Sequence, residues 1–373
     1  MRIAITGADG FLGWHARGAL RARGTDEVIP IGRELADDTE RLGLALSGVD
    51  AVLHLAGVNR ADDDRAFLDN VLLAQGLTSA LDSVSTRPMV VFANSIQTGS
   101  TSPFGETKQA AADHLLSWGG RTGAQVADIR LPNLFGEHGR PHYNSVVATF
   151  CYLLAQGGEP TIMQDRLLNL LHVQDAVDQM LELVARPTTG IFAPEGRMMQ
   201  VSQILERLRG FHDLYVTGDI PNLEDPFDRS LFNTYRSFCF PALYPIHPVV
   251  RSDDRGDLFE CLRARGGQCS VFCSSTHPGV TRGDHFHRRK VERFLVLQGS
   301  AVIALRQLFA DEVVKFNVSG DRPAIIDMPT MWTHSITNTG SGDLMTLFWA
   351  DEILDAQKTD TYAERVEMLG ELA

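Results

Sequence analysis

The chain has 373 residues, with 34 basic and 47 acidic side chains and a formal net charge of -13. This length exceeds what one hydrophobic core usually organises, so we expect two domains. The negative charge argues against nucleic acid and anionic membranes as partners.

The amino terminus, MRIAITGADGF, passes from an apolar strand into a glycine turn, without the charged, apolar and cleavage regions of a signal peptide. No apolar run approaches membrane-spanning length. The five cysteines are odd in number and include no CxxC pair. We therefore expect a cytoplasmic protein in a reducing compartment.

Residues 1 to about 185 alternate short apolar runs with helical stretches, which predicts a parallel sheet covered by helices. A fourth strand is expected over residues 51–59. Between about 190 and 245 the pattern loosens to one amphipathic helix, around residues 201–212, and a segment that either closes over a substrate or packs as a subdomain.

A proline-rich stretch, residues 240–248, is the predicted linker. Beyond it, short apolar runs between glycine and aspartate turns are typical of an all-β domain. We predict a Rossmann-type, doubly wound α/β domain over residues 1–245 and an all-β barrel over residues 246–373.

Gly7, Gly10 and Gly13 stand in GxxGxxG spacing, directly after a strand and before a helical pattern. Small residues let the backbone approach a pyrophosphate, and the helix amino terminus supplies amide donors. A glycine triplet alone is weak evidence, but its place at the start of an alternating α/β pattern predicts dinucleotide binding.

Arg33 follows the second predicted strand, where NAD enzymes usually carry an acid for the ribose hydroxyls. A guanidinium there favours a 2'-phosphate, so we expect NADPH. The alternative is that Arg33 is a solvated loop charge, since Glu34 lies next to it.

The strand that ends at Ser95 is followed by Phe104 nine residues later and then by Lys108. This spacing resembles the Ser, Tyr and Lys set of short-chain dehydrogenases. In that family the serine holds the substrate carbonyl, the tyrosine donates a proton, and the lysine lowers the tyrosine's pKa and binds the ribose. The resemblance implies a cofactor site formed by Gly7, Gly10, Phe11, Leu12, Gly13, Arg33, Leu55, Ala56, Gly57, Asn70 and Lys108.

Phe104 occupies the tyrosine position of that set. A phenyl ring cannot donate a proton, and general acid catalysis typically supplies a factor of ~10²–10⁴. Three explanations remain: an engineered inactivating substitution, a natural loss of reductase activity, or a proton delivered by Ser102, Tyr143 or water.

Residues 130–136, RLPNLFG, resemble the R-x-x-N-x-x-G segment of extended dehydrogenases that act on nucleotide sugars. That resemblance implies a nucleotide-sugar substrate, held through UDP or CDP, rather than a simple alcohol. The substrate-binding residues that it implies are Asn133, Tyr143, Asn144 and His172.

Gly279, His285, His287, Glu292 and Gly299 have the spacing of the first cupin motif, and His334 follows in the second. Two residues apart on a strand, two imidazoles project onto one face of a barrel. The resemblance predicts a jelly-roll cupin with four metal ligands: His285, His287, Glu292 and His334. Such N and O donors suit zinc, nickel, iron or manganese.

Met331 departs from the P-x-G of the second cupin motif, which we expect to alter a turn rather than a ligand. Residues 253–260 and 279–287 also resemble metal-free deoxysugar epimerases built on the same barrel. In those enzymes the histidine at the place of His285 is the catalytic base. Because His285 cannot be both a ligand and a free base, a bound metal would leave Lys290, His287 or a nearby residue as the base, and we include Lys290 among the catalytic residues.

From end to end, the chain resembles the bifunctional CapF-type enzymes of capsular-polysaccharide biosynthesis. The resemblance implies that a zinc-bearing cupin epimerises C3 of a UDP-4-keto-6-deoxy-N-acetylhexosamine and that the dehydrogenase domain reduces C4 with NADPH. Phe104 places the reductase step in doubt. Because cupins often pair through strand edges, we also expect a homodimer.

Two other classes of function fit the same residues. An oxygen-using cupin enzyme would employ the three histidines and the glutamate with iron, which metal content and oxygen uptake would reveal. Alternatively, the cupin is a dimerisation module whose metal only stabilises the fold.

Overall fold

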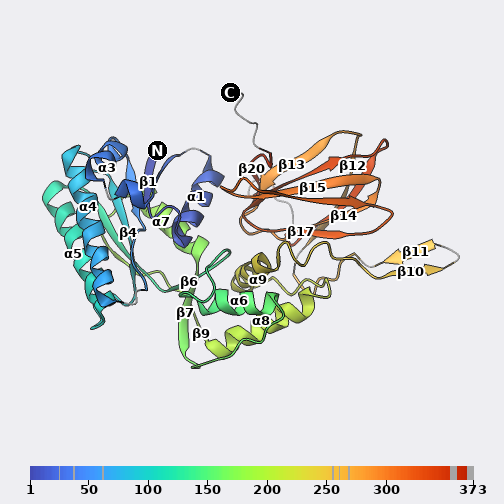
Figure 1. Ribbon diagram of the computed structural model, residues 1–373, viewed down its shortest axis with the longest axis horizontal. Helices are drawn as coiled ribbons and strands as arrows, with labels where there is room; N and C mark the ends of the chain where they lie inside the picture. The colour runs from blue at the N-terminus through green and yellow to red at the C-terminus, as the bar shows by residue number, and fades with distance from the viewer. Residues whose placement is uncertain are drawn as a thin grey trace. The chain divides into compact units, whose positions relative to one another are not determined.

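The computed structural model describes residues 1–24, 26–36, 38–60, 63–253, 256–259, 261–267, 269–352 and 359–367. The chain forms two compact units, shown in Figure 1. The first unit contains Met1–Thr149 and Met163–Val201, and the second contains Phe150–Ile162 and Ser202–Ala373. The domain boundary predicted between residues 245 and 246 stays a prediction.

The first unit is built on a parallel sheet of six strands in the order β2-β1-β3-β4-β5-β8. The strands are β1 (Arg2–Thr6), β2 (Glu27–Ile31), β3 (Ala51–His54), β4 (Met89–Ser95), β5 (Val126–Leu131) and β8 (Gly190–Phe192). Apolar runs form these strands because helices cover both faces, and β3 is buried at every position. A smaller sheet contains β6 (Asn133–Phe135), β7 (Leu167–His172) and β9 (Arg197–Gln200).

The core on one face of the large sheet includes residues of α1 and α7, and the core on the other face includes residues of α3, α4 and α5. The helices of this unit are α1 (Phe11–Arg23), α2 (Arg33–Ala36), α3 (Thr39–Leu46), η1 (Asp64–Leu68), α4 (Asp69–Ser83), α5 (Pro103–Thr122) and α7 (Val173–Ala185). Helix α6 (Val146–Ala155) begins in the first unit and ends in the second. The predicted doubly wound α/β fold is confirmed. The strand expected over 51–59 is the third in the chain rather than the fourth, because residues between β2 and β3 form helices.

The second unit contains two antiparallel sheets, in the orders β12-β19-β14-β17 and β16-β15-β18-β13-β20, which confirms the predicted cupin-like barrel. Its strands are β12 (Ser270–Thr276), β13 (Thr281–Phe286), β14 (Glu292–Gln298), β15 (Ser300–Gln307), β16 (Val313–Ser319), β17 (Ile325–Met328), β18 (Trp332–Asn338), β19 (Leu344–Ala350) and β20 (Tyr362–Ala363). A hairpin of β10 (Val250–Asp253) and β11 (Gly256–Phe259) precedes them.

Two helices accompany the barrel strands: α8 (Val201–Tyr215), which was predicted, and α9 (Pro226–Cys239), which was not. The end of α8 is tied to the barrel because the Tyr215 hydroxyl donates to Asp327, 2.7 Å away. Asp327 also pairs with Arg293 through two buried bonds of 2.6 and 3.0 Å. The predicted linker is anchored as well, since Ile246 exchanges backbone hydrogen bonds with Ile325.

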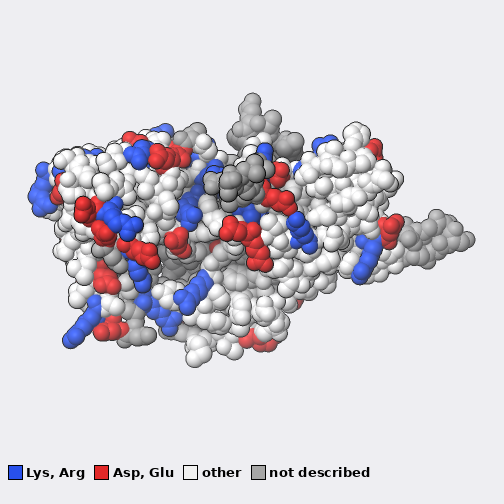
Figure 2. Space-filling view, turned by 45° about the horizontal axis from the view of Figure 1, so that its top comes forward, with Lys and Arg blue, Asp and Glu red and all other residues white. Residues whose placement is uncertain are grey.

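The face drawn in Figure 2 carries acidic and basic side chains interspersed. The charge of -13 is therefore not gathered into one acidic surface on that face. Among the helices that the structure describes, none combines the length and the apolar character needed to cross a membrane.

Candidate functional site

Two clusters of predicted site residues form, one in each unit. In the first unit the turn after β1 has little room for side chains. Gly7 adopts a φ of +67°, and a β-carbon there would lie 2.8 Å from the amide nitrogen of Ala56. A β-carbon at Gly13 would lie 2.2 Å from the carbonyl oxygen of Gly7. This turn, which has no room for side chains, leads into α1 at Phe11 and Leu12. The backbone amides in the first turn of a helix have no partner within the helix, so they can receive a phosphate.

Thr6, which was not predicted as a site residue, fastens this turn to the end of β3. Its hydroxyl oxygen accepts from the backbone amides of Leu55 and Ala56, each at 3.2 Å. No local pattern marks this role, because the two amides lie 49 and 50 positions along the chain from Thr6. Arg33, at the start of α2, is exposed.

Gly57, Asn70 and Lys108, three of the predicted cofactor residues, lie together. A β-carbon at Gly57 would lie 2.9 Å from Oδ1 of Asn70 and 3.4 Å from Nζ of Lys108. The buried side chain of Asn70 holds the loop by accepting from the Val58 amide at 2.9 Å and donating to its carbonyl at 3.1 Å. Lys108 is also buried, and this burial lowers its pKa to about 8, although Asp128 acts in the opposite direction.

The structure places Ser95 at the end of β4 and Phe104 in the first turn of α5. The Ser95 hydroxyl accepts from the amide of Gln97 at 3.1 Å. Phe104 packs edge-on against Phe67, with ring centroids 5.8 Å apart. Ser102, one of the alternative proton donors, caps α5 by accepting from the Gly105 amide at 3.1 Å.

Of the predicted substrate residues, Asn133, Tyr143 and Asn144 are exposed. Asn133 donates to the carbonyl oxygen of Asn169 at 3.1 Å. His172 is buried instead, and its Nε2 lies 3.2 Å from Oε2 of Glu137.

Glu137 is a fully buried carboxylate that was not predicted. Burial raises its pKa, but the contact with His172 more than offsets this, so the net pKa lies below the ordinary range. The backbone oxygen of Glu137 also lies 2.9 Å from Nε2 of His15, on α1. Glu137 therefore links β7 to the helix that follows the glycine turn.

In the second unit, His285, His287, Glu292 and His334 come together, each offering one ligand atom within 4.8 Å of the others. His285 lies on β13, Glu292 begins β14 and His334 lies on β18, directly opposite His285 in the strand register. His287 follows the end of β13.

A bulge in β13 aims His285 at the cluster. The register against β18 shifts between Gly283 and His285, and Asp284 has a φ of +56°. Gly283 is required there, because its φ is +105° and a β-carbon would lie 2.6 Å from the carbonyl oxygen of His334. Met331, the departure from the cupin motif, forms a buried turn at φ +65°, which is where a glycine would be unstrained.

The donor atoms fit a cation. Oε2 of Glu292 lies 3.1 Å from Nε2 of His287 and 3.3 Å from Nε2 of His334, the latter without the alignment of a hydrogen bond. Nδ1 of His287 lies 2.5 Å from the carbonyl oxygen of Asp360 and must donate to it. With Nδ1 donating to Asp360, Nε2 of His287 is the nitrogen that faces the Glu292 carboxylate, and either a proton or a metal ion can lie between them.

The protonation of the cluster also suits a metal. Burial lowers the pKa of His285 to about 3, helped by His334 and His287. Burial raises the pKa of Glu292, but its contacts with His287 and His334 outweigh this and hold it well below its usual range. Neutral imidazoles and an ionised carboxylate are the forms that bind divalent cations.

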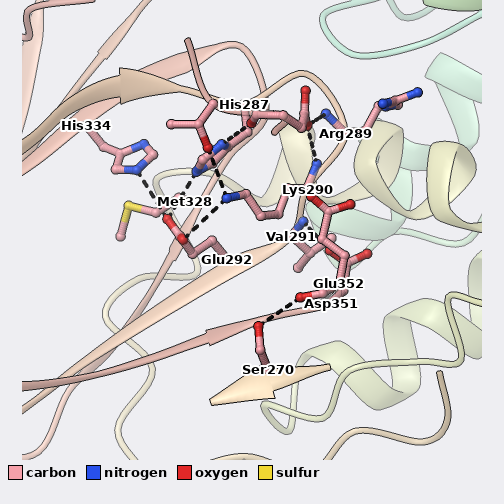
Figure 3. A network of polar contacts seen from close by, with 12 residues as sticks. Ser270, His287, Arg289, Lys290, Val291, Glu292, Met328, His334, Asp351 and Glu352 are labelled. Atoms are coloured by element: carbon pink, nitrogen blue, oxygen red, sulfur yellow. Dashed lines mark hydrogen bonds and ion pairs between the residues drawn. The ribbon is translucent and has the colours of Figure 1, made fainter. Parts of the chain in front are cut away.

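Lys290 lies beside this cluster, as Figure 3 shows. Its buried Nζ is 3.9 Å from Oε1 of Glu292 and donates to the Thr361 hydroxyl at 3.2 Å. The segment predicted to resemble deoxysugar epimerases, residues 253–260, falls partly outside the described residues, since 254, 255 and 260 are not among them.

Comparisons with known proteins cover both units. Residues 3–193 match the NAD dependent epimerase/dehydratase family, and residues 251–362 match the polysaccharide biosynthesis C-terminal domain. A UDP-2-acetamido-2,6-beta-L-arabino-hexul-4-ose reductase of Pseudomonas aeruginosa is 32% identical over 369 residues, covering 97% of this chain and 98% of that protein.

Solved structures also match this chain. The capsular polysaccharide assembling protein CapF of Staphylococcus aureus matches with a TM-score of 0.62 at 31% identity, over 98% of this chain and 100% of that one. A structure of RMD from Pseudomonas aeruginosa complexed with NADPH matches with a TM-score of 0.53 at 22% identity, over 57% of this chain and 82% of that one. The second likeness shows the fold alone.

Proposed function

This chain belongs to the NAD-dependent epimerase/dehydratase family and is of CapF type, and we propose that it epimerises and reduces a UDP-4-keto-6-deoxy-N-acetylhexosamine. It is a nucleotide-sugar modifying enzyme. We assign epimerisation at C3 to the barrel and reduction at C4 to the dinucleotide-binding unit. The observation that carries the proposal is the cluster of three histidines and one glutamate, three of them buried, in a chain that matches a hexul-4-ose reductase over 97% of its length.

The residues that would hold a divalent metal, with zinc as the proposed ion, are His285, His287, Glu292 and His334. Such an ion supplies Lewis acidity toward a ketone oxygen. The 4-keto group of the substrate acidifies the hydrogen on C3. Removal of that proton gives an enolate, and return of a proton to the opposite face inverts C3.

We assign removal of the C3 proton to Nζ of Lys290, and the proton that reaches the opposite face would come from solvent. Its place 3.9 Å from Glu292, in a buried position outside the proposed ligand set, supports the assignment. His285 is the base at the corresponding place in metal-free epimerases, but as a metal ligand it would have no free nitrogen facing the substrate.

For the reduction, NADPH would transfer hydride to C4, and the ketone oxygen would gain a proton. Gly7 and Gly57 support cofactor binding because neither position has room for a side chain. Lys108 supports it because its Nζ lies beside Gly57. Ser95 would hold the ketone oxygen. Phe104 supplies no proton, so we propose that this second step is slow in this chain.

Asn133, Tyr143 and Asn144 are the proposed contacts of the UDP-sugar, since all three are exposed. His172 is buried against Glu137, so we propose that it supports this site from within. A homodimer and a cytoplasmic location remain proposals.

Incubation with UDP-4-keto-6-deoxy-N-acetylglucosamine in D₂O tests the epimerase assignment. Deuterium should enter at C3 with the unaltered protein, and exchange should fall to the uncatalysed rate in His287→Ala. Catalysed exchange that survives His287→Ala unchanged would remove the cluster from the mechanism.

A further inference from the structure

We infer that Asp360 is a positioning residue of the metal centre, holding the 287–290 turn so that His287 presents Nε2 to the other ligands. The inference rests on the proposed metal site and adds a residue outside the four ligands. Asp360 is only 2% exposed and lies 73 positions after His287 in the chain.

The first contact sets the tautomer of His287. The carbonyl oxygen of Asp360 can only accept, so Nδ1 of His287 carries the proton that forms the 2.5 Å bond. Nε2 is then the nitrogen free for a metal, and it is the one that faces Glu292. Orienting bonds of this kind tune both the basicity and the direction of an imidazole ligand.

The second contact fixes the turn itself. The Asp360 carboxylate accepts from three successive backbone amides, at 3.2 Å from Arg288, 2.6 Å from Arg289 and 2.8 Å from Lys290. Hydrogen bonds to an ionised acceptor are about twice as strong as neutral ones. One buried carboxylate therefore holds the whole turn between His287 and β14. Figure 3 labels His287, Arg289 and Lys290 of this turn.

The third contact extends this support to the other side of the cluster. Thr361, next to Asp360, accepts from Nζ of Lys290, and β20 then pairs with β13 so that Ala363 lies opposite His285. Residues 360–363 thus touch the strand of His285, the turn of His287 and Lys290. We conclude that this segment aligns ligands that the barrel strands alone do not fix.

The test is a titration of the full-length, metal-free protein with Zn²⁺ against a chromophoric chelator. Asp360→Ala keeps the backbone carbonyl that bonds His287 but removes the carboxylate that holds the turn. It should weaken zinc binding about 10- to 100-fold, the range for loss of a partner outside the ligand shell. Asp360→Asn keeps one acceptor oxygen and should lie between Asp360→Ala and the unaltered protein.

Asn338→Ala is the matched control. Asn338 is also buried and also makes three bonds to backbone groups of the barrel, at 2.8, 2.9 and 2.9 Å, with Thr276, Gly342 and Gly340. Asn338→Ala should lower the melting temperature of the metal-free protein about as much as Asp360→Ala but leave zinc affinity unchanged.

The outcomes separate this inference from the proposed function. Equal zinc affinity in Asp360→Ala and the unaltered protein would overturn the role of Asp360 while leaving the metal centre in place. Loss of affinity in Asn338→Ala to the same extent would also overturn it, since the effect would then follow barrel stability. An unaltered protein that binds neither zinc, nickel, iron nor manganese would overturn the metal centre, and the inference with it.

Discussion

Nζ of Lys108 donates a 2.9 Å hydrogen bond to the carbonyl oxygen of Ala93 on β4. This bond holds the amine beside Gly57, in the proposed cofactor site, where a β-carbon at Gly57 would be 3.4 Å from it. Because the site is buried, the pKa of Lys108 falls from 10.5 to about 8. The charge of Lys108 therefore changes within an accessible range of pH.

NADPH affinity should depend on that charge. The phosphates of NADPH are anionic, so they favour the charged form of Lys108. Above about pH 8, where Lys108 of the free protein is partly deprotonated, NADPH binding therefore takes up a proton. Affinity should be highest below about pH 8 and fall above it, measured by cofactor fluorescence from about pH 7 to 9.5. Lys108→Met should bind more weakly and show no such fall; a fall that persists in Lys108→Met would assign the titration to another group.

Arg33 should decide between the two nicotinamide cofactors. It is exposed at the start of α2 and is free to meet a 2'-phosphate. A charge-assisted bond to phosphate contributes ~1.5–3 kcal/mol, so Arg33→Ala should weaken NADPH binding by about 10- to 100-fold and leave NADH nearly unaffected. Equal losses for both cofactors in calorimetric titrations would contradict the role of Arg33.

The ligand set predicts metal content directly. Glu292→Ala and His287→Ala should each empty the site, because Glu292 lies within 3.3 Å of two of the other ligands. Elemental analysis of purified protein gives the measurement. A full complement of metal in both variants would refute the set.

Asp327 should matter for stability rather than for chemistry. Its removal leaves Arg293 as an unpaired buried cation, at a cost of ~3–5 kcal/mol in the free energy of unfolding. Glu159→Ala is the control, because its pair with Arg209 is 85% exposed on the glutamate side and contributes only ~0–1 kcal/mol. Denaturation curves that show equal losses for Asp327→Ala and Glu159→Ala would contradict this account.

The sequence predicted what is local. Three predicted features each depend on short stretches of sequence: the glycine turn, the α/β alternation, and the spacing of His285, His287 and Glu292. The structure has the glycine turn between β1 and α1, and it has the alternating strands and helices. Helix α9 was missed even though Asp225 and Pro226 supply a standard start, with the Asp225 carboxylate accepting from Phe227.

What the sequence could not show depends on distant parts of the chain. Asp360 reaches His287 across 73 positions, and Glu137 meets His15 across 122. Neither residue type carries a recognisable pattern of its own, because their roles arise only when β20 pairs with β13 and when Glu137 meets both His172 and His15. Such partners come from tertiary packing, which no local spacing encodes.

The two half-reactions should separate in this chain, and one experiment measures both. With the 4-keto sugar and NADPH in D₂O, deuterium should enter C3 at a steady rate while NADPH oxidation stays slow. Phe104→Tyr should raise NADPH oxidation by about two orders of magnitude, the range for regaining a positioned general acid, and leave C3 exchange unchanged. Rapid NADPH oxidation by the unaltered protein would contradict the claim, because another group would then be supplying the proton.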